Sequence, residues 1–420
     1  MSRTEFDLRY GKSTVRVSVP SASIAGVLLP AEPVLPSDEK AEIERALRNT
    51  TGSPPLEEMA KPGMKVVIMA SDITRPSPSH ELLPPLLERL KSAGLAESDI
   101  TIVFGMGIHR HMTDAEKRTL VGDDVFERYR CVESSESGEY VFLGTTSRGT
   151  PVEVCPEVAS CDFLICTGNI EYHYYAGYTG GVKAVLPGAC SQRTIEANHA
   201  MQMLPGAEMG SYDKNPVRQD MEEAGKIIGV DFILNVVLDE KKNIVKAVAG
   251  DPVLAHAEGR EAVDRLYGIP VERGAEIVVV SAGGKPKDLN LYQAQKALEN
   301  AVRAVRPGGV MILLAECPDG LGDQKFEEYM TSYPLDEIIE RIERQFVLGA
   351  HKAAVIARNL KKADIYLVSA LSPETVKACK LTPFGSAQEA VDAAFRKLGD
   401  GAKVLVMPFG GSTVPIPKSM

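Results

Sequence analysis

Hydrophobic residues follow two different periods along this chain. In residues 6–10 and again in 15–19 every second residue is apolar, and Gly11 lies between the two stretches. This alternation predicts a β-hairpin. Further along, short apolar runs such as residues 65–70 (KVVIMA) are followed by stretches such as 80–93, where apolar residues recur at helical spacing. The chain therefore predicts a hairpin followed by alternating strands and helices.

The strand–helix alternation runs through two parts of the chain. In the first part, strands are predicted at 65–70, 99–104, 163–166, 232–238 and 244–248, and helices at 38–49, 80–93, 191–201 and 252–267. In the second part, strands are predicted at 276–281, 310–315, 364–369 and 403–407, and helices at 293–305, 334–345, 351–360 and 387–398. Such a repeat is typical of a mainly parallel sheet flanked by helices. We predict an α/β protein with one such sheet in each of two domains, residues 1–270 and 271–420.

Composition narrows the class of protein. Of 420 residues, 44% are hydrophobic and 25% are charged, which is typical of a globular chain. The formal net charge of −10 argues against a nucleic-acid partner and against an anionic membrane surface. No apolar run reaches the roughly 18 residues of a membrane span, and the first residues lack the apolar stretch of a signal peptide. We expect a cytoplasmic protein that acts on a small molecule and holds any anion by local cations.

Two loops that follow predicted strands carry charge or imidazole. Arg75 comes just after the strand at 65–70 and can form two parallel hydrogen bonds with a carboxylate or phosphate, although pairing with Asp72 on the surface is an alternative. The loop after the next strand contains His109 and His111, whose spacing makes a zinc site conceivable. Its glycines do not form a dinucleotide fingerprint, because Arg110 occupies the third glycine position.

The third loop holds a lysine in an apolar and aromatic setting. Gly180 and Gly181 allow a close approach of the backbone to an anion, and Lys183 follows two residues after Gly181. A partly desolvated lysine loses its proton more easily and can serve as a nucleophile or an attachment point, while a phosphate-binding lysine is the alternative. His173 and His199 flank this loop as a possible base and a possible metal ligand, or as structural histidines. Residue chemistry alone thus indicates an anion-binding α/β enzyme.

Several motifs together resemble the nickel-pincer lactate racemase family over nearly the whole chain. They are TRP at 74–76, GMGIHR at 105–110, the block from Ile170 to Gly188, ANH at 197–199 and DLNLYQAQK at 288–296. The resemblance implies a racemase or epimerase that inverts C2 of a 2-hydroxy acid, with its active site in a cleft between the two domains. It also implies a nickel-pincer pyridinium nucleotide, which other proteins must synthesise.

The resemblance assigns a role to each candidate residue. Lys183 would form a thioamide with the cofactor, His199 would bind nickel, and His109 and His173 would be the two bases. Further cofactor contacts would come from Asp72, Thr74, Gly180 and Gly181, and substrate contacts from Arg75, Gln293, Lys296 and His351. Hydride transfer to a pyridinium avoids a carbanion, and two bases are needed because the enantiomers present their hydroxyl groups on opposite sides.

Two departures from the family pattern concern the substrate. Val182 stands where lactate-type members have an arginine, and the chain has no tryptophan. His351, with Lys352 beside it, matches the position of the family's tryptophan and predicts a substrate more polar than lactate, of the malate or aldonate type. The alternatives to a racemase are a zinc-dependent hydrolase that uses His109, His111 and His199, and a non-catalytic anion-binding protein.

Overall fold

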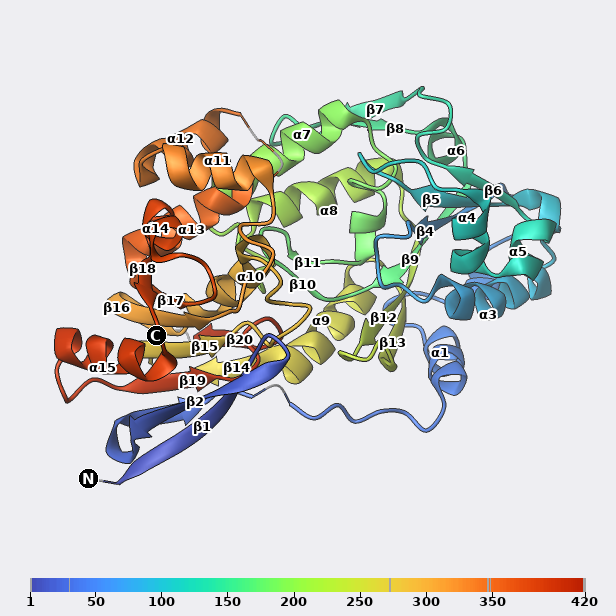
Figure 1. Ribbon diagram of the computed structural model, residues 1–420. Helices are drawn as coiled ribbons and strands as arrows, with labels where there is room; N and C mark the ends of the chain where they lie inside the picture. Colours follow the sequence, from blue (N-terminus) through green and yellow to red (C-terminus); the bar gives the residue numbers. More distant parts are fainter. Residues whose placement is uncertain (1, 30, 272, 346, 348, 418–420) are drawn as a thin grey trace. The chain divides into compact units, whose positions relative to one another are not determined.

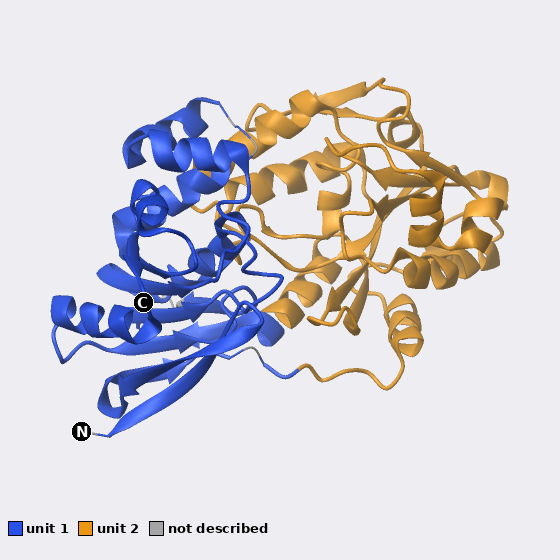
Figure 2. Cartoon of the chain, in the orientation of Figure 1, with its two compact units in different colours: residues 1–32, 265–420 blue, residues 33–264 orange. Residues whose placement is uncertain are grey.

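The chain forms two compact units. The computed structural model describes residues 2–29, 31–271, 273–345, 347 and 349–417. Unit 1 comprises residues 1–32 and 265–420, and unit 2 comprises residues 33–264 (Figure 2).

Unit 2 is built on a six-stranded sheet in which only one strand is antiparallel (Figure 1). From edge to edge its strands are β13 (Ile244–Gly250), β12 (Phe232–Leu238), β9 (Phe163–Asn169), β4 (Val66–Ser71), β5 (Ile100–Gly105) and β6 (Arg130–Glu133). β4 comes first in the chain and lies in the middle, with β5 on one side and β9 on the other. The carboxyl ends of β4 and β9 therefore form a topological switch point, where open α/β sheets bind their ligands.

Helices bury one face of this sheet. α3 (Ser79–Ser92) buries five leucines at positions 82, 83, 86, 87 and 90, whose spacing of three and four residues forms one helical face. These leucines share a core with α1 (Glu39–Arg48) and with alternate residues of the central strands, such as Ile68 and Ile102. The short helix η3 (Gly181–Ala184) contacts β4 and β9. The segment that carries Lys183 therefore packs directly on the central strands.

Unit 1 contains a second six-stranded sheet, and all of its strand pairs are parallel. Its order is β18 (Thr382–Phe384), β17 (Asp364–Val368), β16 (Val305–Leu314), β15 (Ala275–Ser281), β19 (Val404–Met407) and β3 (Ile24–Val27). The N-terminal hairpin, β1 (Arg3–Tyr10) and β2 (Ser13–Pro20), packs on this sheet through Leu8, Val17 and Val19. This differs from the predicted domain boundary, because residues 1–32 lie with the C-terminal sheet rather than with residues 33–264.

The predicted α/β fold with two mainly parallel sheets is confirmed, and most elements lie within a few residues of their predicted positions. One predicted helix, 293–305, is shorter, since α10 (Leu291–Ala301) ends before β16 begins. The sequence prediction missed α8 (Pro216–Ile228), although Asn215 and Pro216 form a typical helix start. No helix within the described residues combines the length and apolar character that crossing a bilayer requires.

Candidate active site

Most predicted site residues of unit 2 follow the carboxyl ends of β4, β5 and β9, while His199 lies on the helix α7 (Gln192–Ala200). Asp72, Thr74 and Arg75 follow β4, and His109 follows β5. The segment with His173 and Lys183 follows β9. These strands are neighbours in the sheet, so their ends meet at the switch point.

His109 is paired with a buried carboxylate. Its Nδ1 hydrogen-bonds to Oδ2 of Asp72, which is only 2% exposed, whereas the His109 side chain is 37% exposed. Thr74 donates to the other carboxylate oxygen from its hydroxyl at 2.6 Å and from its backbone at 3.0 Å. Burial acts to raise the pKa of Asp72, but the hydrogen bonds from His109 and Thr74 outweigh it and lower the pKa. Asp72 thus stays charged, orients His109 and leaves Nε2 as the nitrogen that can exchange a proton.

His173 lies in an aromatic setting close to Lys183. Its Nδ1 accepts a hydrogen bond from the backbone of Ala176 at 3.2 Å. Its ring centroid lies 4.5 Å from that of Tyr175, and the centroid of Tyr175 lies 5.2 Å from that of His199. The two histidines therefore contact the same tyrosine from different elements.

Three neighbouring groups in this setting have lowered pKa values. Burial, together with the charges of Lys183 and other cations, holds the pKa of His173 well below its usual value. Burial and the nearby Arg75 charge lower the pKa of Lys183 to about 7, and burial and Lys183 lower that of His199 to about 3. At neutral pH both imidazoles are uncharged, and a large part of the lysine is a free amine.

The environment of His199 fits a metal ligand. Asn198 donates from Nδ2 to the Asp220 carboxylate at 2.8 Å and to the Val217 carbonyl at 3.1 Å, which fixes the orientation of its amide. Its Oδ1 therefore faces His199 Nδ1 at 3.2 Å, and this nitrogen must be the donor. The lone pair then lies on Nε2, where a neutral imidazole binds a transition metal.

The glycine turn predicted to contact the cofactor, Gly180 and Gly181, packs against other residues of unit 2. Gly180 and Gly181 have φ values of 75° and 60°, and a side chain on either would collide with buried groups of the unit, including Asn235 and Arg218. The Gly181 N–H already donates to Asn235 at 2.7 Å. The turn is therefore packed against protein, and its contact with a cofactor phosphate stays a prediction.

Sequence reasoning missed the polar cluster beneath this turn. Arg218 is fully buried, pairs with Glu222 at 2.8 Å and donates to the carbonyls of Tyr178 and Gly180. His256, also fully buried, donates from Nε2 to Thr179 at 2.8 Å. The cluster holds three successive carbonyls just before the lysine. No spacing in the sequence points to it, because Arg218 and His256 come from two separate helices.

The predicted substrate contacts of unit 1 lie on two packed helices. Gln293 and Lys296 are exposed on α10, and His351 begins α13 (His351–Lys362). Lys352 donates to the carbonyl of Tyr292 at 3.0 Å, and burial with the neighbouring Lys296 charge lowers its pKa to about 8. Burial and Lys352 lower the pKa of His351 to about 4.

The geometry does not support the three-histidine zinc alternative. His111 bonds to Glu133, whereas His109 bonds to Asp72. Within the described ranges, no three side chains of His, Cys, Asp and Glu gather as a set that could hold a metal ion by themselves. A metal held by one imidazole and by a bound group is compatible with this arrangement.

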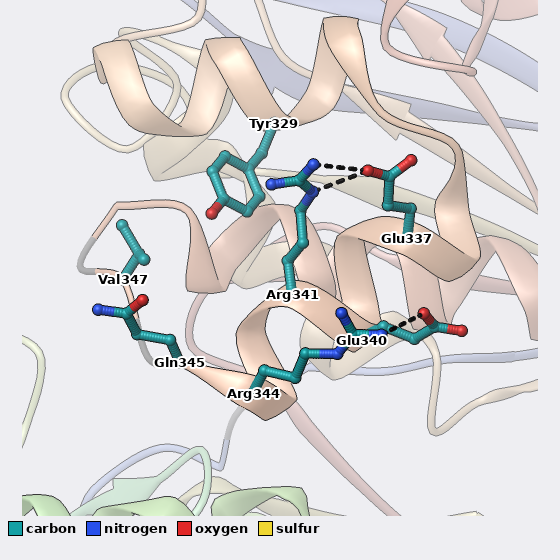
Figure 3. Close-up of a pocket in the computed structure, with 7 residues that line it drawn as sticks. All are labelled: Tyr329, Glu337, Glu340, Arg341, Arg344, Gln345 and Val347. Carbon is teal, nitrogen blue, oxygen red and sulfur yellow. Dashed lines mark hydrogen bonds and ion pairs between the residues drawn. The ribbon is translucent and has the colours of Figure 1, made fainter.

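A groove of about 280 Å³ in unit 1 contains none of the predicted site residues. It lies along α11 (Gln324–Ser332) and α12 (Leu335–Arg344) and is lined by Tyr329, Glu337, Glu340, Arg341, Arg344, Gln345 and Val347 (Figure 3). Arg341 pairs with Glu337 at 2.7 Å and Arg344 pairs with Glu340 at 3.4 Å. The charges compensate one another, so nothing in this groove calls for an ionic ligand.

Comparison with known proteins agrees with this arrangement. Residues 10–210 match the model of the lactate racemase N-terminal domain, and residues 271–414 match that of the C-terminal domain. The lactate racemase of Thermoanaerobacterium thermosaccharolyticum is 32% identical over 97% of this chain and 98% of its own length. The lactate racemase of Lactiplantibacillus plantarum is 33% identical over 96% of this chain and 98% of its own length.

A solved structure shows the same fold. The lactate racemase apoprotein from T. thermosaccharolyticum superposes with a TM-score of 0.85, covering 98% of this chain and 100% of the other at 32% identity. The family models, the relatives and the shared fold agree over nearly the whole length. The chain is therefore an isomerase that belongs to the lactate racemase family.

Proposed function

We propose that this chain inverts C2 of a 2-hydroxy acid with the help of a nickel-pincer pyridinium nucleotide attached to Lys183. The observation that carries the proposal is the partly neutral amine of Lys183 beside two neutral imidazoles, His173 and His199, the second with its Nε2 available. The loop of His109 contacts the loop of Lys183 through the hydrogen bond from Gly107 to Gly188. When bound, the nucleotide supplies an electron-poor ring that exchanges hydride with C2.

The protein's own side chains handle the proton and the carboxylate. His109, held by Asp72 through Nδ1, takes the hydroxyl proton of one enantiomer on Nε2. His173 takes the hydroxyl proton of the other enantiomer on Nδ1, the lone-pair nitrogen of the neutral ring, which releases the Ala176 N–H as it does so. The alcohol passes through a planar 2-keto acid. Arg75 binds the substrate carboxylate, and Gln293 and Lys296 on α10 are further substrate contacts.

We further propose a substrate more polar than lactate. His351 matches the position of the family's tryptophan, and the neighbouring Lys352 is half-buried and held in place by the Tyr292 carbonyl. A second cation near Lys296 favours a second anionic or hydroxylated end on the substrate. Malate and aldonates carry such groups.

The test is a turnover assay on protein produced together with the cofactor-forming proteins. Optically pure lactate, malate and gluconate, each deuterated at C2, are followed by chiral chromatography and mass spectrometry. We expect inversion with the deuterium retained. We also expect a kcat/KM for malate or gluconate at least about tenfold above that for lactate, which corresponds to about 1.4 kcal/mol in activation free energy. Lys183→Ala should lack the added mass of the nucleotide and be inactive.

Each part of the proposal has its own contrary result. Exchange of the deuterium with solvent during inversion would reject hydride transfer. Lactate as clearly the best substrate would reject the polar pocket. Failure to invert any 2-hydroxy acid, in protein whose mass shows a full load of cofactor, would reject the racemase itself.

A further inference from the structure

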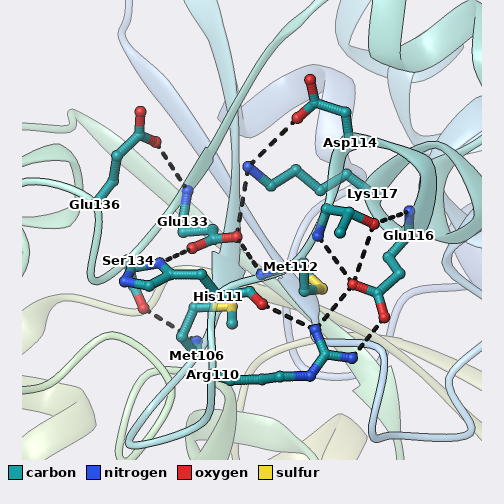
Figure 4. A network of polar contacts seen from close by, with 11 residues as sticks. Met106, Arg110, His111, Met112, Asp114, Glu116, Lys117, Glu133, Ser134 and Glu136 are labelled. Carbon is teal, nitrogen blue, oxygen red and sulfur yellow. Dashed lines mark hydrogen bonds and ion pairs between the residues drawn. The ribbon is translucent and has the colours of Figure 1, made fainter.

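The loop that carries His109 is held at both ends by residues at the end of β6. The Ser134 hydroxyl accepts a hydrogen bond from the backbone of Met106 at 3.0 Å, before His109 in the chain (Figure 4). A Glu133 carboxylate oxygen accepts a hydrogen bond from the backbone of Met112, which follows His109 in the chain, at 2.8 Å. Both side chains are only 4% exposed.

Ser134 also reaches the loop that carries Lys183. Its hydroxyl donates to the carbonyl of Gly188 at 2.7 Å, and the backbone of Gly107 donates to the same carbonyl at 3.0 Å. The two loops approach through their backbones, since a Cβ on Gly105 would lie 3.1 Å from the Cα of Gly188. One buried hydroxyl is therefore hydrogen-bonded to both loops at once.

Glu133 supports this arrangement from the side. Its carboxylate bonds to His111 and lies 3.4 Å from the ammonium of Lys117. Burial acts to raise the pKa of Glu133, but these partners and the Met112 backbone outweigh it and lower the pKa. The carboxylate that anchors the far end of the loop thus stays charged at neutral pH.

We propose that Ser134 is a positioning residue that keeps the His109 loop in register with the Lys183 loop. The proposal rests on the proposed function, in which one loop provides a base and the other attaches the cofactor. The hydroxyl acts both as acceptor and as donor, so alanine would leave the Met106 N–H without its partner and free the loop to shift. A misplacement of about 1 Å can reduce a rate by about 100-fold.

Hydrogen exchange and kinetics on Ser134→Ala test the proposal. In the cofactor-free protein, we expect faster exchange at the amides of Met106 and Gly107, without a general increase across unit 2. In the loaded enzyme we expect kcat to fall about 10- to 100-fold, with KM within about threefold of the original value. Ser134→Cys, of similar size but a weaker hydrogen-bonding group, should lie between serine and alanine and guards against misfolding of the alanine variant.

Ser135→Ala is the matched control, because the buried Ser135 hydroxyl makes no hydrogen bond within the described structure. It should leave both measurements unchanged. Unchanged exchange at Met106 and Gly107 in Ser134→Ala, or a loss of kcat no larger than in the control, would overturn the proposal. If wild-type protein inverts no 2-hydroxy acid, the proposed function fails, while the exchange data still decide whether Ser134 couples the two loops.

Discussion

His256 shows at the residue scale how unit 2 uses neutral imidazoles. The ring has no exposed surface, lies beside the Arg218 guanidinium and donates to the Thr179 carbonyl. Burial and the Arg218 charge hold the pKa of His256 well below its usual 6.5. The neutral ring can therefore support the turn before Lys183 without adding a further charge beneath it.

This depressed pKa predicts how stability depends on pH. Below about pH 6.5 the unfolded chain binds a proton at His256 and the folded chain does not, so the free energy of unfolding falls as the pH falls. The contribution is at most about 1.4 kcal/mol per pH unit. In urea titrations between pH 7 and pH 5, His256→Gln should show a shallower decline than the wild type.

His80→Gln is the control for this titration. The His80 side chain is 54% exposed, so His80→Gln makes the same chemical change at the surface of unit 2. An equally steep decline in wild type and His256→Gln would show that His256 takes up its proton in the folded state as well.

At the scale of elements, α8 connects helix capping with the site. Asn215 caps the helix by accepting from the backbone of Arg218 at 3.0 Å, and its amide donates to the carbonyl of Tyr175 at 2.8 Å. The residue is completely buried. One side chain thus fixes both the start of the helix that carries Arg218 and the tyrosine between His173 and His199.

We expect Asn215→Ala to destabilise unit 2 by about 2–3 kcal/mol. Loss of a cap costs about 1 kcal/mol, and the unpaired buried Tyr175 carbonyl adds about 1–2 kcal/mol. Asp38→Ala removes an exposed cap, on α1 of the same unit, and should cost only about 1 kcal/mol. Urea unfolding of both variants measures the difference, and equal losses would contradict a double role for Asn215.

At the scale of the whole molecule, the N-terminal segment completes a distant sheet. β3 pairs with β19 as an edge strand, and the hairpin buries Leu8, Val17 and Val19 in the core of unit 1. Each of these side chains is at most 1% exposed. Unit 1 is therefore made of two segments separated by more than 200 residues of unit 2.

This connectivity predicts how fragments fold. Residues 33–264 contain a complete core and should unfold cooperatively by themselves, as circular dichroism in urea would show. Residues 265–420 should give a cooperative transition only when the peptide 1–32 is supplied, because they otherwise expose the apolar surface that the hairpin covers. A cooperative transition of 265–420 alone, of unchanged midpoint when the peptide is added, would contradict the prediction.

Local sequence patterns were enough to predict the kinds of elements, their approximate positions and a set of candidate site residues. Hydrophobic periodicity is a local property, so β4, α3 and the hairpin could be predicted from their own residues. The motifs around Lys183 and His199 resembled a family strongly enough to indicate the class of reaction.

Which distant residues meet could be learned only from the folded chain. Strand order brings together His109 and Asp72, and likewise Ser134 and Gly188. It also determines how the hairpin packs on the sheet of unit 1. Strand order follows from how several elements pack together, and no single stretch of sequence contains that information. The orientation of the Asn198 amide, which places the lone pair of His199 on Nε2, depends on Asp220 and Val217 on another helix in the same way.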